Sequence, residues 1–240
     1  MKSAWDKKAN SYPRYEEKLN KFQQEFFDKL DEYGVDFTDK TVIDVGCGTG
    51  VKTLHLAKMC KNVTGLDLST KMLECMREDA KKFGISNLNI VESDWTSYEV
   101  DEIYDIAFST MSPAIVDIKD FDKFMNAGKK RIYLWWNKPR RSSLVDKFYE
   151  IYGHRKDWFD RASSFEYHLQ MQKIPFKSEV MDEVRTKELS LQEAYENVTW
   201  HLDIGNIKFD ENSVKKELLN ISVNENITET VSASMKLLVF

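Results

Sequence analysis

Short apolar runs alternate with longer amphipathic stretches along the first half of this 240-residue chain. Runs rich in β-branched residues predict buried strands, and stretches with apolar positions three and four residues apart predict helices. The expected strands cover residues 41–45, 62–66, 88–91, 103–109 and 131–136. The helices expected between them cover residues 51–61, 70–83 and 121–125. Ser69 is placed to cap the second of these helices, and Gly84 to end it.

This alternation of strands and helices predicts an α/β fold. Right-handed crossovers between parallel strands give a doubly wound, mostly parallel sheet with helices on both faces. Beyond Asn137 the pattern is less regular, and we expect helices at 142–152 and 190–202 and strands at 176–184 and 232–240. Residues 158–172 are rich in aromatic side chains, and their pattern assigns them to no element. We expect residues 1–240 to form a single domain.

One amphipathic helix is expected before the first strand. Its apolar face recurs at helical spacing, and Gly34 should end it. The positions on that face are Tyr15, Leu19, Phe22, Phe26, Phe27 and Leu30.

The motif Asp44-Val45-Gly46-Cys47-Gly48-Thr49-Gly50 carries the strongest chemical signal. It lies between a predicted buried strand and a predicted helix, at the edge of the sheet where doubly wound folds bind ligands. Glycine lets a backbone take positive φ and come close to a ligand. The spacing Gly-x-Gly-x-Gly differs from the Gly-x-Gly-x-x-Gly of dinucleotide-binding folds, which disfavours a nicotinamide cofactor.

The segment TVIDVGCGTG resembles the first motif of the class I S-adenosylmethionine (SAM)-dependent methyltransferases. That resemblance implies a Rossmann-like sheet of seven strands whose last strand is antiparallel. It also implies that Gly46, Cys47, Gly48 and Gly50 pass under the methionine part of SAM. Asp44 would then lie near the amino group of the ligand or brace the loop.

Two further acids fit the same family. Asp67 follows the second strand, where a carboxylate can accept hydrogen bonds from both ribose hydroxyls, and Leu68 and Met72 would flank the adenine. Asp94 follows the third strand, where the family places an acid near the adenine amine with the next residue, Trp95, close to the ring. A helix-terminal acid for Asp67 and a polar loop residue for Asp94 are the structural alternatives.

The resemblance extends to the ends of the pocket. The stretch from Trp5 to Tyr12 is similar to the N-terminal lid of ubiquinone- and menaquinone-type methyltransferases. In such a lid Tyr12 would bind the SAM carboxylate. The equal alternative is a helix that only packs on the domain. The resemblance divides the single domain into an N-terminal helical lid (1–35), a SAM-binding core (36–137) and an elaborated C-terminal half (138–240). Ser109 and Thr110, at the end of the fourth strand, are candidates for the methyl-transfer pocket.

The acceptor pocket should be aromatic and apolar. Aromatic side chains there would suit a flat or apolar small molecule. The candidates are Trp5, Tyr12, Met111, Trp135, Trp136 and Trp158, with at most one of the adjacent pair Trp135 and Trp136 facing the cleft. The sequence Ser112-Pro113-Ala114 departs from the acidic or amide-Pro-Pro-aromatic motif of adenine and glutamine amide methyltransferases, which argues against that subclass.

Composition narrows the class of partner. A net charge of −5 gives no broad basic field, which argues against a nucleic-acid partner. Three cysteines without a CxxC pair suit reduced thiols, and no stretch is long and apolar enough to span a membrane, so we expect a cytoplasmic protein. No metal-ligand spacing and no Gly-x-Ser-x-Gly elbow occurs, and the sequence indicates no general base.

Several functions remain in competition. The leading one is transfer of a methyl group from SAM to a small molecule, with S-adenosylhomocysteine (SAH) as the product. The others are methylation of RNA or protein, SAM binding without catalysis, and nicotinamide-dependent oxidoreduction. The sequence indicates neither the methyl acceptor nor an oligomeric state.

Overall fold

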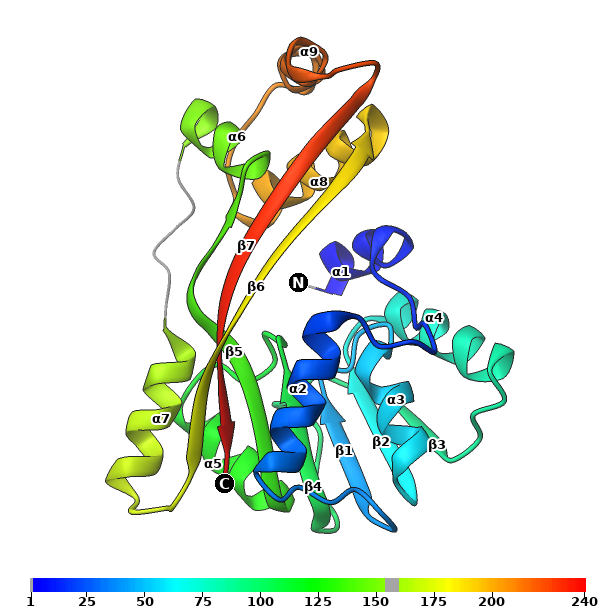
Figure 1. Ribbon diagram of the computed structural model, residues 1–240, viewed down its shortest axis with the longest axis vertical. Coiled ribbons are helices and arrows are strands. Elements are labelled where there is room, and N and C mark those ends of the chain that lie inside the picture. Colours follow the sequence, from blue (N-terminus) through cyan, green and yellow to red (C-terminus); the bar gives the residue numbers. More distant parts are fainter. Residues whose placement is uncertain (1, 154–159) are drawn as a thin grey trace. The chain divides into compact units, whose positions relative to one another are not determined.

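The computed structural model describes residues 2–153 and 160–240, which form two compact units (Figure 1). The core unit comprises residues Met1–Asn137, Arg161–Met181 and Met235–Phe240, and the second unit Lys138–Asp160 and Asp182–Ser234. The chain therefore passes between the units four times, at the residue steps 137/138, 160/161, 181/182 and 234/235. A single folding domain over all 240 residues stays a prediction.

The strands of the described residues form one mixed sheet in the order β3-β2-β1-β4-β5-β7-β6. They are β1 (Thr41–Val45), β2 (Asn62–Asp67), β3 (Leu88–Glu92), β4 (Tyr104–Thr110), β5 (Gly128–Ser142), β6 (Lys177–Ser190) and β7 (Asn226–Val239). Strands β1 to β5 pair in parallel. Arg131 and Phe240 exchange both backbone hydrogen bonds, which is the antiparallel pattern. The predicted fold, including the antiparallel last strand, is confirmed.

Helices cover both faces of the sheet in the core unit. The described helices of the core unit are α1 (Lys2–Lys8), the 3₁₀ turn η1 (Ala9–Ser11), α2 (Lys21–Glu32), α3 (Val51–Met59), α4 (Thr70–Lys82), α5 (Ile118–Ala127) and α7 (Arg161–Met171). Those of the second unit are α6 (Val145–Tyr152), α8 (Leu191–Ile204) and α9 (Glu211–Ile221). Ile43 and Val45 join a buried cluster with side chains of α5 and α7. The ring of Phe108 on β4 meets Phe26 of α2 on the opposite face, where α2 and α3 lie (Figure 1).

The N-terminal segment differs from the prediction. A continuous helix through Tyr15 and Leu19 was expected, but helix α2 begins only at Lys21 and residues 12–20 are irregular. Tyr12 is extended, with ψ at 148°, because a residue before proline is pushed out of the helical region. Pro13 is thus the signal that ends the first helical segment.

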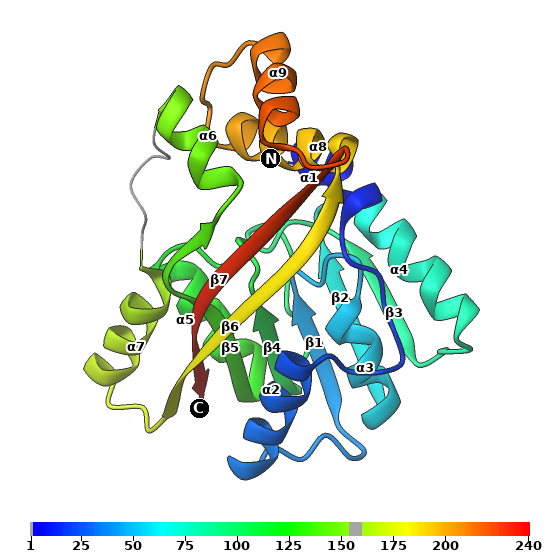
Figure 2. The same cartoon turned by 45° about the horizontal axis from the view of Figure 1, so that its top comes forward.

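Polar side chains begin the helices largely as expected. Ser69 caps α4 by accepting the backbone N–H of Met72 at 3.2 Å, and α4 lies beside β3 (Figure 2). Ser190 and Glu193 form a reciprocal capping box at the start of α8. Helix α9 was not predicted, although Asp210 caps it. Among the described residues, no helix is long and apolar enough to cross a membrane.

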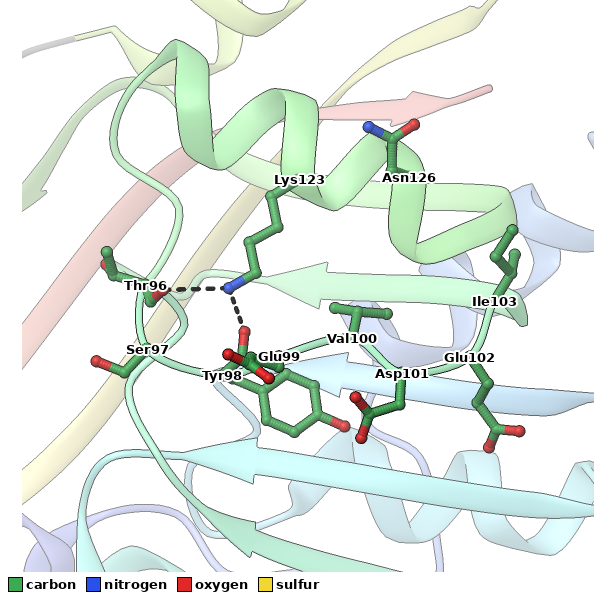
Figure 3. Close-up of a pocket in the computed structure, with 10 residues that line it drawn as sticks. All are labelled: Thr96, Ser97, Tyr98, Glu99, Val100, Asp101, Glu102, Ile103, Lys123 and Asn126. Carbon is green, nitrogen blue, oxygen red and sulfur yellow. Dashed lines mark hydrogen bonds between the residues drawn. The ribbon is translucent and has the colours of Figure 1, made fainter.

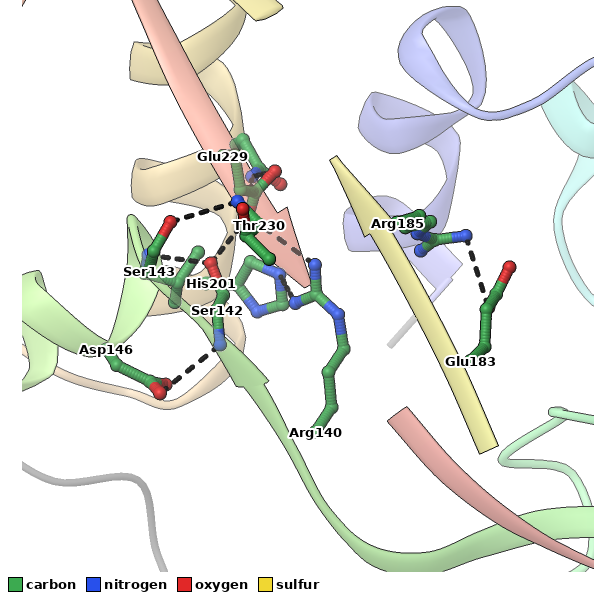
Figure 4. A network of polar contacts seen from close by, with 11 residues as sticks. Arg140, Ser142, Ser143, Asp146, Glu183, Arg185, His201, Glu229 and Thr230 are labelled. Carbon is green, nitrogen blue, oxygen red and sulfur yellow. Dashed lines mark hydrogen bonds and ion pairs between the residues drawn. The ribbon is translucent and has the colours of Figure 1, made fainter. Parts of the chain in front are cut away.

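The second unit has its own apolar core and a buried polar network. Leu144, Phe148, Val198 and Leu218 pack together between α6, α8 and α9. Beside them, the Glu229 carboxylate accepts a hydrogen bond from Ser142 Oγ at 2.5 Å and lies 3.5 Å from the Arg140 guanidinium (Figure 4). Glu229 is only 1% exposed, so the arginine and the hydroxyl provide the compensation that a buried charge requires.

Candidate functional site

The glycine loop has a backbone that only glycine adopts without strain. Gly46, Gly48 and Gly50 all have positive φ, at +75°, +57° and +80°. The backbone N–H groups of Gly46 and Cys47 both donate to the carbonyl of Leu66, at 2.7 and 3.0 Å. The loop therefore folds over the carboxyl end of β2, at the edge of the sheet where β1 also ends.

Asp67 lies at the end of β2 and holds this loop. Its Oδ2 accepts the backbone N–H of Gly48 at 2.9 Å, and its Oδ1 accepts that of Ser69 at 2.8 Å. Burial raises the pKa of the Asp67 carboxyl, while these backbone donors oppose the shift. Each carboxylate oxygen can accept more than one hydrogen bond, so Asp67 keeps acceptor capacity for a ligand.

A pocket opens at this edge of the sheet, entirely within the core unit. It is lined by Trp5, Tyr12, Gly46, Gly48, Leu66, Asp67, Leu68, Met72, Ser93, Asp94, Trp95, Met111, Ser112, Pro113 and Ala114. The structure thus brings together eight of the predicted cofactor-site residues: Tyr12, Gly46, Gly48, Asp67, Leu68, Met72, Asp94 and Trp95. Apart from Met72 of α4, they come from the N-terminal segment and from the ends of three parallel strands, β1, β2 and β3, as the topology of the fold requires.

The other four predicted residues do not line the pocket. Asp44 is 3% exposed and accepts a hydrogen bond from Thr53 Oγ1 at 2.6 Å, which links the end of β1 to α3. Ser109 is buried and donates to the carbonyl of Val45 at 2.9 Å. A Cβ on Gly50 would lie 2.4 Å from Met76 Cγ, so this glycine serves the packing of the loop on α4. Cys47 is also absent from the lining.

The predicted acceptor-pocket residues are divided in the same way. Trp5, Tyr12 and Met111 line the pocket, whereas Trp135 and Trp136 do not. Trp135 packs against the buried cluster beneath α5 and α7, and the Arg161 guanidinium lies 4.9 Å from its ring centre. Trp158 lies outside the described residues.

The N-terminal segment is fixed to the core unit by charged contacts. The Asp6 carboxylate accepts hydrogen bonds from Ser69 Oγ at 2.7 Å and from the backbone N–H of Lys71 at 3.1 Å, at the N-terminus of α4. Arg14 binds both oxygens of the buried Asp79 carboxylate, each at 2.8 Å. These contacts place Trp5 and Tyr12 at the pocket, which explains why a segment remote in sequence contributes to it.

The loop after β4 supplies residues that the sequence did not assign to the cofactor site. Met111 has φ at +55°, which is uncommon for a residue with a Cβ, and its backbone N–H donates to the Leu134 carbonyl at 2.8 Å. A Cβ on Gly46 would lie 1.7 Å from Ser112 Oγ, so the loop after β4 packs directly on the glycine loop. The signal available in the sequence was the spacing of Ser112-Pro113-Ala114 after a buried strand.

A second hollow lies away from the glycine loop (Figure 3). It is lined by Thr96 to Ile103 and by Lys123 and Asn126 of α5. It contains no residue of the loop after β1 or of the end of β2, and it is broadly open to solvent. The pocket at the glycine loop is therefore the candidate functional site. Among the described residues, no group of three or more His, Cys, Asp or Glu side chains is arranged to hold a metal ion.

The environment of Asp44 predicts a pH dependence of stability. Burial raises the pKa of the Asp44 carboxyl to about 6, against an ordinary value of 3.8. Between these values the folded state holds a proton that the unfolded state has lost, so the free energy of unfolding falls as pH rises from about 4 to about 6. Two pKa units correspond to roughly 3 kcal/mol. Urea unfolding of wild type and Asp44→Asn across this range measures it.

The pKa of Asp67 is also raised, so its titration changes the stability of both proteins. The effect of Asp44 is therefore the difference in the free energy of unfolding between wild type and the Asp44→Asn variant. We expect that difference to decrease from pH 4 to pH 6 and to be constant above pH 7. A difference that stays constant from pH 4 to pH 7 would show that Asp44 ionises normally in the folded protein.

Comparisons with known proteins match the part of the chain that contains the glycine loop. Residues 42–130 match the family model of a methyltransferase domain. The chain is 40% identical over 128 residues to a probable (S)-tetrahydroprotoberberine N-methyltransferase 2 from Papaver bracteatum, covering 50% of this chain and 34% of that protein. It is 30% identical over 119 residues to an uncharacterized protein from Haemophilus influenzae, covering 48% of this chain and 44% of that one. The chain thus spans less than half the length of these curated relatives.

The fold also matches a solved structure. A SAM-dependent methyltransferase from Thiobacillus denitrificans, in complex with SAH, superposes with a TM-score of 0.52 at 15% identity, covering 96% of this chain and 95% of that one. The matched segment, residues 42–130, holds the glycine loop, Asp67 and Asp94 and is similar to a methyltransferase domain. The fold of the chain is that of the SAM-dependent methyltransferase structure.

Proposed function

We propose that this protein transfers a methyl group from SAM to a small-molecule acceptor. The observation that carries the proposal is the pocket in which Gly46, Gly48, Asp67 and Asp94 meet at the carboxyl ends of β1, β2 and β3. A loop with positive φ allows the backbone to approach a ligand, and two acids flank it.

The residues of the pocket fit SAM. A Cβ on Gly48 would meet only the ring of Tyr12, at 4.0 Å, so the absent side chain leaves open space inside the pocket. Asp67 has acceptor capacity left for two ribose hydroxyls, and Asp94, whose pKa is lowered by the backbone N–H of Ser97, stays ionised to accept from an amine. Both carboxylates also favour a ligand that carries positive charge.

The remaining wall suits an apolar or aromatic acceptor. Trp5 and Tyr12 meet edge to face, with ring centres 6.2 Å apart, and Met111 and Pro113 also line the pocket. Aromatic faces attract organic cations as well as flat apolar groups. Amines are therefore the first acceptors to test, which agrees with the N-methyltransferase name of the relative from Papaver bracteatum.

The chain's contribution to the reaction is orientation and electrostatics. SAM, when bound, supplies an electrophilic methyl group on its sulfonium. Holding donor and acceptor in line contributes on the order of 7–11 kcal/mol in favourable cases. In this protein the glycine loop and Asp67 would position the donor, while Trp5, Tyr12 and Met111 would exclude water and orient the acceptor.

Titration calorimetry with SAH, SAM and NAD tests the proposal. We expect micromolar binding of SAH and SAM and no binding of NAD. Turnover of methyl-labelled SAM with a panel of amines and metabolite extracts would then identify the acceptor. Binding of neither sulfur ligand would refute the proposal, and binding without turnover on any acceptor would favour a SAM-binding protein that lacks catalysis.

The competing polymer substrates have a separate readout. Binding to RNA that weakens steeply with rising salt would favour an RNA methyltransferase. Transfer of label to protein rather than to a small molecule would favour a protein methyltransferase. The net charge of −5 supports the small-molecule proposal over RNA.

A further inference from the structure

Three backbone carbonyl groups converge on the ammonium of Lys123. Its Nζ donates to the carbonyl of Trp95 at 2.5 Å, to that of Thr96 at 3.3 Å, and to that of Tyr98. Lys123 comes from α5, while the three carbonyls belong to the loop that follows Asp94. Figure 3 shows the lysine reaching from its helix to this loop.

The loop needs a cation at this point. Three carbonyl dipoles directed at one place repel one another, and an ammonium, with three N–H donors and no acceptor, satisfies all of them. The same Nζ lies 4.5 Å from the ring centre of Trp95, within the range of a cation–π contact. Because the ammonium is partly buried, desolvation lowers the pKa of Lys123, and the carboxylates of Asp120, Asp94 and Glu99 oppose that shift.

The groups that Lys123 holds adjoin the candidate site. Asp94 and Trp95 line the pocket, whereas Lys123 does not. Asp94 also holds the loop that follows it. Its carbonyl accepts the backbone N–H of Tyr98 at 3.1 Å, and its Oδ1 accepts the backbone N–H of Ser97 at 2.9 Å. The backbone of Asp94 and Trp95 is thus fixed between these turn contacts and the ammonium.

We propose that Lys123 is a positioning residue of the SAM pocket, an internal cation that sets the place of Asp94 and Trp95 without touching the ligand. This inference rests on the proposed function. Without the ammonium, the three carbonyls turn to water or separate, and the wall formed by Asp94 and Trp95 loses its fixed position. Ligand affinity then falls even though no ligand contact has been removed.

Chemical rescue tests the proposal. Lys123→Ala removes the side chain beyond Cβ, and n-propylammonium supplies the missing three carbons and the ammonium. We expect Lys123→Ala to weaken SAH binding about tenfold, as for the loss of one well-made hydrogen bond. Millimolar n-propylammonium should restore most of that affinity, and n-propanol should restore none. Lys119→Ala, an exposed lysine on the same helix, should bind SAH like the wild type.

The outcomes separate this inference from the proposed function. Wild type that fails to bind SAH refutes the function. Wild type and Lys123→Ala that bind SAH equally refute the inference alone. An affinity loss that n-propanol restores as well as n-propylammonium also refutes it, because filling space would then suffice. Should Lys123→Ala not fold, Lys123→Met and Lys123→Arg allow the same comparison: the arginine variant should retain more affinity than the methionine variant, and equal affinities would overturn the proposal.

Discussion

Replacement of Asp67 by alanine is expected to weaken SAH binding about a thousandfold. The carboxylate would accept two hydrogen bonds from the ribose, and bonds to a charged group contribute about 2 kcal/mol each, which gives roughly 4 kcal/mol. Asp67 also accepts the backbone N–H of Gly48 at 2.9 Å, so the variant loosens the glycine loop as well. Calorimetry with SAH measures the loss.

A matched control separates ligand binding from stability. Asp101→Ala removes an exposed acid of the same core unit that does not line the glycine-loop pocket, and it should leave SAH affinity unchanged. Circular dichroism of Asp67→Ala should show an intact fold, because the sheet itself does not depend on this side chain. An Asp67→Ala protein that is folded and binds SAH as tightly as wild type would remove the ribose assignment.

Gly46→Ala is expected to lower the free energy of unfolding by about 4 kcal/mol. The left-handed conformation, φ at +75°, costs a residue with a Cβ about 1–2 kcal/mol. The new Cβ would also lie 1.7 Å from Ser112 Oγ and 2.5 Å from Ser112 Cβ, so the loop after β4 must move, and overpacking typically costs about 1–3 kcal/mol. Urea unfolding measures the sum.

Two companion variants divide this effect into its parts. Gly48→Ala shares the positive φ but meets only Tyr12 at 4.0 Å, so it should cost stability only about 1–2 kcal/mol while weakening SAH binding. The double variant Gly46→Ala/Ser112→Gly removes the clashing atoms and should recover much of the stability lost. If Ser112→Gly and Gly46→Ala have additive effects, the two loops are not in the contact described.

The glycine loop and the acids after β2 and β3 could be predicted because their chemistry is local in sequence. Gly46, Gly48 and Gly50 all have positive φ, a backbone conformation that other residues adopt only with strain. A glycine at each of these positions therefore indicates the turn directly. Ser69 and its helix were likewise predictable, since a cap and its N–H partner are three residues apart.

Features that depend on contacts distant in sequence were not predictable. Asp44 and Ser109 belong to motifs at the pocket, yet their side chains are satisfied by Thr53 and by the Val45 carbonyl instead of lining it. Lys123 is indistinguishable in the sequence from other helix-surface lysines, because the three carbonyls that it binds lie 25 to 28 residues away. The irregular segment after Tyr12 is different, because its cause, Pro13, is local in the sequence. The helical spacing of Tyr15 and Leu19 obscured that signal.

The position of β7 in the sheet has a consequence for biosynthesis. It lies between β5 and β6, although both of those strands precede it in the chain. Until the ribosome has translated residues 226–239, the edge of β5 and the edge of β6 that β7 will pair with therefore have no backbone partner. An open edge is a template for pairing with other chains. The nascent protein is thus exposed to aggregation until β7 pairs, and chaperone binding before that point should protect the edge of β5.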